Sequence, residues 1–205
     1  MDNFFRLLFI WSMPVMISIV VVTAVRYRLD VQLGDSSVAS ENWGLRRNLD
    51  PFFSLLLPIV LILIHHPFML AFPRQRSSYD IKSDREWRRY QALGNFSVHA
   101  LLTLICTLLF AVAITTQPQT GMPGLTYYWP KAGIFFNVTM GLMHLLPWPP
   151  FLLGTMLVNN RLADRISDRS GVVVGAVLIL AIPAHYGYGQ LVFPVYHWLC
   201  AIAGL

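Results

Sequence analysis

Apolar segments of about twenty residues recur along this chain, and the short connections between them carry most of its charge. A helix that crosses a membrane needs about 20 mostly apolar residues, because the hydrocarbon layer is about 30 Å thick. Only 12% of the 205 residues are charged, about half the fraction typical of soluble domains. This composition excludes a disordered chain, a solenoid of soluble repeats and an ordinary cytosolic enzyme. It predicts an all-α, polytopic integral membrane protein.

Six apolar segments are long enough to be considered as spans, although the last two are short. They cover residues 7–25, 51–72, 94–115, 132–158, 171–184 and 191–205. The first is too long for the core of a signal peptide and is interpreted as an uncleaved anchor. The whole chain, 1–205, is therefore one predicted transmembrane domain. It is divided into an N-terminal helix with its loop (1–50), a core (51–165) and a C-terminal helical hairpin (166–205).

The charged connections predict an orientation, since cytoplasmic loops are rich in Lys and Arg. Two connections are basic, one with Arg74, Arg76, Lys82, Arg85, Arg88 and Arg89, the other with Arg161, Arg165 and Arg169. They predict a cytoplasmic side that also holds the N-terminus. The connection 117–131, with only Lys131 and an aromatic belt at 127–129, is then outside. The loop 26–50 is also placed outside, although it carries four arginines. The predicted location is a bacterial inner membrane or an organelle membrane of bacterial descent.

The net charge of +5 does not indicate nucleic acid, because no basic helix or stacking platform accompanies it. Basic loops between apolar segments favour anionic lipid instead. The predicted partners are the lipid bilayer and other integral membrane subunits. Cys106 and Cys200 lie in apolar segments far apart in sequence and are predicted to be core residues.

All six histidines fall within or at the ends of apolar segments: His65, His66, His99, His144, His185 and His197. Ionisable groups at membrane depth are costly and are therefore candidates for function. The alternative is that a neutral imidazole simply donates a hydrogen bond to a carbonyl or a neighbouring helix. The group at 65, 66, 99 and 144 is the more suggestive, because the other two lie near expected interfaces.

The fourth segment contains a dense proline cluster, in the sequence HLLPWPPFLLG at 144–154. It resembles the third core helix of the site-2 proteases, which are intramembrane zinc metalloproteases that typically read Asn-Leu-Leu-Pro-x-Pro-Pro-Leu-Asp-Gly here. Pro147, Pro149 and Pro150 match that pattern. His144 stands where the family has Asn, and Leu152 stands where it has a zinc-binding Asp.

Two upstream segments resemble the same family in the same order. The sequence ILIHHPFMLA at 62–71 is similar to the helix that carries His-Glu-x-x-His in site-2 proteases. His65 aligns with the first zinc ligand, His66 replaces the catalytic Glu, and Met69 replaces the second ligand. The sequence GNFSVH at 94–99 is similar to the Gly-Pro-rich opening of the second core helix. The resemblance covers roughly residues 51–165.

The departures from the family pattern predict that the chain is not an enzyme. A catalytic zinc needs three protein ligands and a carboxylate that takes a proton from bound water. Of the aligned ligands only His65 is present, and the three segments lack Asp and Glu apart from Asp50 at a border. We expect no catalytic residue and no bound metal. The vestigial site would comprise His65, His66, Met69, His144, Pro147, Pro149, Pro150 and Leu152.

The resemblance to site-2 proteases, together with the missing zinc ligands and catalytic Glu, favours a catalytically inactive protein without a cofactor. Such a protein would be a structural, accessory or assembly subunit of a larger membrane complex. The alternative is a subunit of an electron-transfer or photosynthetic complex in which His65, His99 or His144 ligates haem or a chlorophyll-type pigment. In a continuous helix His65 and Met69 would share one face at i and i+4, and both are soft ligands. A metalloenzyme with altered ligands and a transporter are weaker alternatives.

Overall fold

The computed structural model describes residues 2–33, 44, 49–72, 84–116, 124–147, 151–157, 168–181 and 187–204. These residues form seven α-helices and one π-helical segment, which confirms the all-α prediction. In chain order the elements are α1 (Asp2–Gln32), η1 (Pro51–Leu56), α4 (Leu57–Leu63), α5 (Asp84–Thr116), α6 (Leu125–Met143), α7 (Leu152–Leu157), α9 (Asp168–Ala181) and α10 (Gly189–Gly204).

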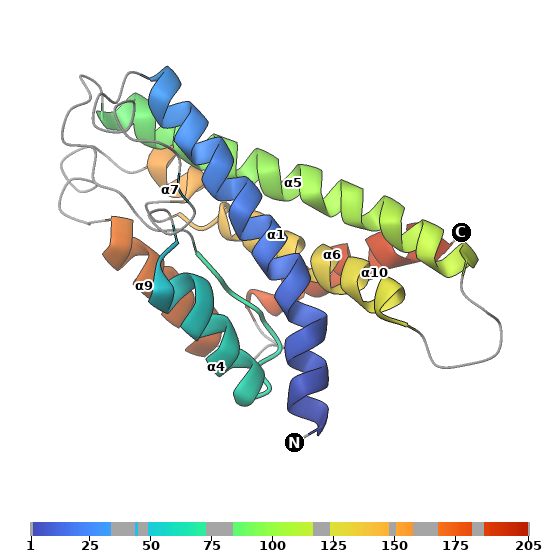
Figure 1. Ribbon diagram of the computed structural model, residues 1–205. Helices are drawn as coiled ribbons and strands as arrows, with labels where there is room; N and C mark the ends of the chain where they lie inside the picture. The colour runs from blue at the N-terminus through green and yellow to red at the C-terminus, as the bar shows by residue number, and fades with distance from the viewer. Residues whose placement is uncertain are drawn as a thin grey trace.

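Helix α6 is the centre of the molecule, and α1, α5 and α10 pack around it (Figure 1). Every side-chain position from Ala132 to Gly141 is buried. A helix that is buried all round must be apolar on every face, and these ten residues contain only two polar side chains, Asn137 and Thr139. Thr139 donates its hydroxyl hydrogen to the carbonyl oxygen of Phe135 within the same helix, at 2.8 Å.

Two helices are long and apolar enough to cross a membrane, Phe4–Gln32 and Arg89–Thr116, each with a mean hydropathy of 2.3. Both also expose apolar side chains along one outward face. On α5 these are Leu101, Leu104, Ile105, Leu108, Leu109 and Val112, and on α1 they are Phe5, Phe9, Met13 and Ile17. Their spacing of three and four residues forms continuous stripes, and such stripes are rare on soluble monomers. The other four predicted segments contain no helix that meets the same criterion among the described residues.

The segment 51–72 is not the continuous span that its hydropathy predicted. The helical part ends at Leu63, and the chain turns at His65 and returns without regular structure. The two arms meet at their base, where Phe72 N–H donates to Phe53 O at 3.1 Å and Ser54 Oγ donates to Phe72 O at 2.6 Å. Thirteen helical residues rise about 20 Å, and seven extended residues cover about 23 Å. The segment is therefore a closed hairpin.

Pro67 and the backbone geometry of His65 explain where this hairpin turns. Pro67 has no N–H to donate, and its ring disfavours the helical conformation at His66. His65 has a φ of 53°, in the left-handed region, and His66 N–H donates to Leu61 O at 2.9 Å. This is the hydrogen-bond pattern that ends a helix with a left-handed residue. A proline is common shortly after such a helix end, because it cannot continue the helix.

The helix directions differ from those that six successive spans would give. Arg6 Nη2 donates to Tyr128 Oη at 3.2 Å, and Trp129 Nε1 donates to Phe9 O at 3.1 Å. The first turns of α1 and α6 therefore lie together, whereas Gln91, near the start of α5, contacts Arg26 O near the end of α1. The N-terminus and the connection 117–131 were predicted on opposite sides, whereas the described residues place the starts of α1 and α6 at the same end. The difference arises because the segment 51–72 folds back and does not cross.

Candidate functional site: a buried polar cluster beside a helix break

Asn137 connects three helices inside the apolar core. Its Nδ2 donates to Ser18 Oγ of α1 at 3.0 Å and to Gly133 O of α6 at 2.9 Å. Its Oδ1 lies 2.9 Å from Nδ1 of His99 on α5. All of these polar side chains are buried. The amide therefore uses both of its donors and its acceptor in positions where unsatisfied polar groups are expensive.

The contacts of Asn137 also determine which ring nitrogen of His99 carries a hydrogen. Gly133 O can only accept a hydrogen bond, so the Asn137 NH₂ group must face it and Oδ1 must face His99. His99 Nδ1 is then the donor, and a neutral His99 ring carries its lone pair on Nε2. The predicted cofactor ligand at this position thus has one nitrogen engaged by Asn137. No role was predicted for Ser18 or Asn137. Each is a polar residue inside an apolar segment, and this was the only sequence signal that could have indicated a buried hydrogen bond.

His144 lies directly after the last residue of α6 and is buried in an aromatic surrounding. Its ring centroid is 6.3 Å from that of Phe96, 6.0 Å from that of Phe151 and 6.4 Å from that of His99. Its Nδ1 is buried without a hydrogen-bond partner among the described residues. The structure therefore brings together two of the predicted histidines, His99 and His144.

The helix break follows His144, as the proline cluster predicted. Pro147 lies at the end of the described part of the break, whereas Pro149 and Pro150 lie outside the described residues. Leu153 N–H donates to His144 O at 2.9 Å, and Gly154 N–H donates to Leu146 O at 3.1 Å. The first amides of α7 thus satisfy the carbonyls released from the end of α6, as an apolar environment requires. Leu152, at the position of the family's zinc-binding Asp, is the half-buried first residue of α7.

The remaining predicted site residues lie on the 51–72 hairpin. His65 is exposed at the turn, with Nδ1 3.2 Å from Leu63 O. His66 is half-buried and accepts a hydrogen bond on Nδ1 from Phe68 N–H at 3.1 Å. Met69 is buried in the returning arm. His65 and Met69 therefore do not share a helical face, and that prediction is wrong because the helix ends at Leu63.

The hairpin turn and the helix break are at different levels of α6. Phe68, three residues after His65, stacks on Phe135 at a ring-centroid distance of 6.2 Å. His144 lies nine residues farther along, a rise of about 13 Å. No described contact joins His65 to His144 or Pro147. Among the described residues, no group of three or more His, Cys, Asp or Glu side chains is placed to hold a metal ion.

Both carboxylates whose side chains the structure describes have structural partners. Asp50 Oδ1 accepts hydrogen bonds from Phe52 N–H at 2.9 Å and Phe53 N–H at 3.1 Å, and thereby caps η1. Asp30 Oδ1 accepts a hydrogen bond from Gln91 Nε2. Asp30 and Gln91 are buried where the end of α1 meets the start of α5.

A polar stripe on α5 was not predicted from the sequence. Gln91, Asn95 and His99 follow one another at intervals of four residues and therefore lie on one face of the helix. Gln91 Oε1 and Asn95 Oδ1 are buried without a hydrogen-bond partner among the described atoms. The stripe leads from the Asp30 contact to the His99–Asn137 pair and links the end of the bundle to its centre.

Comparison with known proteins identified no matching family model, no similar curated protein and no similar solved structure.

Proposed function

We propose that this chain is a catalytically inactive, site-2-protease-like membrane protein that serves as an accessory or assembly subunit of a larger membrane complex. The observation that carries the proposal is that the buried polar side chains hydrogen-bond to one another and to the backbone. His99, Asn137 and Ser18 hydrogen-bond to one another across three helices. Both described carboxylates are engaged in structural contacts. In the described part of the chain, the polar side chains of this arrangement therefore hold helices together, and neither carboxylate is placed beside a histidine to form an acid–base pair.

The likeness to site-2 proteases is supported by the order of three features. A helix with His99, a second helix with Asn137 and a break after His144 follow one another and pack together. The hairpin with His65 lies away from the break, whereas the resemblance implied that His65 and the proline region share one site, so this part of the proposal rests on the sequence alone. The family assignment is part of the proposal.

The proposal includes an orientation in the membrane. The arginines at 26, 28, 46, 47 and 74–89 flank the end of α1, the hairpin and the start of α5, and those at 161–169 follow α7. With the hairpin entering and leaving at one end, all of these belong to a single cytoplasmic side, as the positive-inside rule requires. The N-terminus and the connection 117–124 then lie on the opposite side. The four arginines of 26–50 thus become consistent with the rule.

Purification of the tagged full-length chain in a mild detergent with its native lipids tests the function. We expect one integral membrane protein to remain with it at a fixed ratio through size-exclusion chromatography. A second membrane protein with the same tag, purified in parallel, controls for carry-over. A chain that is quantitatively monomeric under these conditions contradicts the proposal.

The same sample distinguishes the cofactor alternative, which the unpartnered Nδ1 of His144 favours. A visible absorption band of haem or chlorin type, lost in His144→Ala but kept in His65→Ala, would establish that alternative. Stoichiometric zinc that is lost in His65→Ala, together with cleavage of a membrane peptide, would instead show a metalloenzyme. We expect neither signal.

A further inference from the structure

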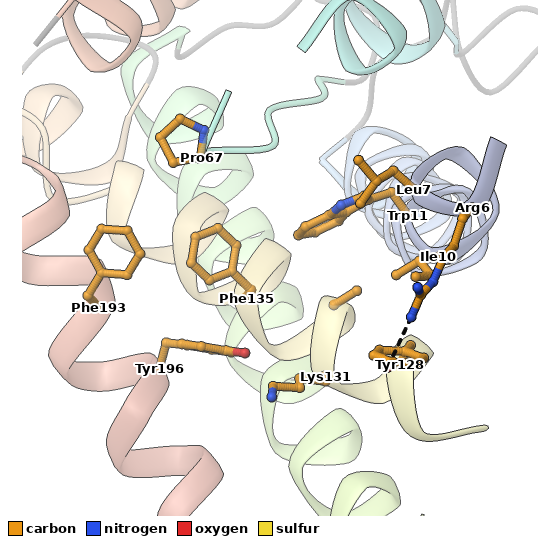
Figure 2. A pocket seen from close by; sticks show the side chains of 11 residues that line it. Arg6, Leu7, Ile10, Trp11, Pro67, Tyr128, Lys131, Phe135, Phe193 and Tyr196 are labelled. Carbon is orange, nitrogen blue, oxygen red and sulfur yellow. Dashed lines mark hydrogen bonds between the residues drawn. The ribbon is translucent and has the colours of Figure 1, made fainter. Parts of the chain in front are cut away.

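A groove of about 430 Å³ runs along α6 between α1 and α10 (Figure 2). Its volume is within the range typical of small-molecule sites, about 300–1,000 Å³. The groove lies at the end of the bundle where α1 and α6 begin. Its two ends differ in chemistry.

One end carries two cations among aromatic rings. Arg6 Cζ lies 5.4 Å from the ring centroid of Tyr128, and its Nη2 donates to Tyr128 Oη at 3.2 Å. Lys131 Nζ lies 5.4 Å from the ring centroid of Tyr127 and 5.9 Å from that of Phe110. Aromatic rings hold cations in place without cancelling their charge.

The described carboxylates are far from this end of the groove. Asp30 is 24 residues after Arg6 on the same helix, a rise of about 36 Å, and Asp50 caps η1 at the base of the hairpin. Arg6 and Lys131 therefore form a positive end that lies far from both of these carboxylates. An anion would be attracted there, more strongly next to a bilayer than in bulk water.

The other end of the groove is apolar and deep. Trp11 meets Phe135 edge to face at a ring-centroid distance of 6.0 Å. Phe193 of α10 lies 5.9 Å from Phe135 on the other side. Figure 2 shows Pro67, from the turn of the hairpin, beyond these rings. A hydrated ion alone would leave this apolar half without a partner.

We propose that the groove binds one anionic phospholipid from the surrounding bilayer. Its phosphate lies at Arg6 and Lys131, with the phenol of Tyr196 on the opposite wall, and one acyl chain runs over Phe135 toward Pro67. A phospholipid fits this groove because its phosphate matches the charged end and its acyl chain matches the apolar end. The lipid then bridges α1 and α10, which both pack on α6.

Lipid retained by the purified full-length chain in nanodiscs tests this proposal. The nanodiscs contain either phosphatidylcholine alone or phosphatidylcholine with phosphatidylglycerol, and native mass spectrometry counts the lipids bound to each chain. A basic side chain near a membrane surface contributes about 1 kcal/mol to binding anionic lipid, which corresponds to a factor of about five. We expect Arg6→Gln or Lys131→Gln to weaken phosphatidylglycerol binding about five-fold and the double variant about thirty-fold.

Arg28→Gln is the matched control, because it removes one exposed cation from the other end of the same helix. Asp2→Asn is a second control, since Asp2 precedes Arg6 by one helical turn. Because Arg28 belongs to the basic side that also attracts anionic lipid, the controls are read at the groove: neither should reduce labelling of the peptides around residues 6–11 by a photoactivatable phosphatidylglycerol. Equal retention by the wild type and the R6Q/K131Q variant overturns the proposal.

A photoactivatable phosphatidylglycerol on the wild-type chain gives an answer even if the variants fail to fold. We expect labels in the peptides around residues 6–11 and 128–135, removed by excess phosphatidylglycerol but not by inorganic phosphate. Competition by inorganic phosphate alone would show a simple anion site and overturn the proposal. A dimer that dissociates in R6Q/K131Q without loss of lipid would show that a second copy occupies the groove, and would also overturn it.

This inference rests on the membrane location proposed above, and the two fail differently. A chain recovered in the aqueous fraction without detergent contradicts the location. A chain embedded in nanodiscs that shows no preference for phosphatidylglycerol contradicts only the groove assignment.

Discussion

Asn137 shows how much a single polar residue contributes inside an apolar bundle. It contacts Ser18 on α1 and His99 on α5 while it remains bonded to its own helix at Gly133. Interhelical hydrogen bonds of this kind stabilise membrane proteins by about 0.6 kcal/mol on average and at most about 1.7 kcal/mol. Removing one partner costs more than the bond itself, because the other polar group stays buried and unsatisfied.

Replacement of Asn137 should therefore destabilise the fold. We expect Asn137→Leu to lower the free energy of unfolding by about 1–3 kcal/mol, because His99 Nδ1 and Ser18 Oγ both lose their partner. In the double variant with His99→Leu the loss should be smaller than the sum of the two single losses. Unfolding of each variant in bicelles measures these values. Strict additivity would mean that the pair is not coupled.

His65 adopts a backbone conformation that few residues tolerate. The left-handed region costs an ordinary residue about 1–2 kcal/mol, whereas glycine adopts it readily. We expect His65→Gly to leave stability unchanged or raise it slightly. A β-branched residue fits this region worst, so His65→Val should lower the free energy of unfolding by about 1–2 kcal/mol. Thermal unfolding of both variants in detergent provides the comparison, and equal losses would exclude backbone strain as the cause.

At the scale of elements, α6 approaches its neighbours closely at one glycine. A Cβ added at Gly133 would lie 2.6 Å from Cys106 Sγ of α5 and 3.6 Å from Pro14 Cβ of α1. Small residues allow such close packing of helices in membranes. Cys106 is free and half-buried, and it contributes to this contact rather than to a disulfide.

We expect Gly133→Ala to destabilise the bundle by about 1–3 kcal/mol, because the added methyl group overlaps Cys106 Sγ. Cys106→Ala should restore most of that loss in the double variant, since it removes the overlapping sulfur. Gly141→Ala is the control on the same helix, because its Cβ would meet His99 Cβ at an ordinary 3.6 Å. Chemical denaturation in micelles measures the free energy of unfolding of the wild type, Gly133→Ala, the double variant with Cys106→Ala, and Gly141→Ala. Failure of Cys106→Ala to rescue would place the clash elsewhere.

At the scale of the whole molecule, the hairpin decides the orientation of every other element. Hydropathy along the chain predicted that 51–72 crosses, and this placed the loop 26–50 and the basic connection that begins at Arg74 on opposite sides. Because the hairpin arms are joined at Phe53 and Phe72, the chain leaves near where it entered. In the proposed orientation the basic connections then belong to one side.

Single cysteines in a chain without Cys106 and Cys200 test this orientation. An impermeant maleimide applied from outside should label Asn3→Cys and Thr120→Cys, because the first turns of α1 and α6 lie at one end. Ser77→Cys should react only after the membrane is opened. Labelling of Thr120→Cys alone from outside, with Asn3→Cys and Ser77→Cys reacting only after the membrane is opened, would restore the orientation predicted from sequence.

The sequence by itself determined the helical class, the apolar character of α1 and α5, and the break after His144. These properties depend on local composition and on prolines, whose effect on the backbone needs no distant partner. The sequence also predicted His99 and His144 as candidates for function, and in the structure their rings lie next to each other. It did not reveal Ser18 as the partner of Asn137, since they are 119 residues apart.

Only the tertiary structure decided where the helix of 51–72 ends relative to its neighbours, which ends of the helices meet and which polar groups pair. Hydropathy averages over a window and does not distinguish a segment that crosses from one that returns beside itself. The reversal at His65 is secured by contacts of Phe53 and Ser54 with Phe72 on the other arm, and the hairpin is held on α6 by the stacking of Phe68 on Phe135, far along the chain. Such long-range contacts exist only once the helices have packed.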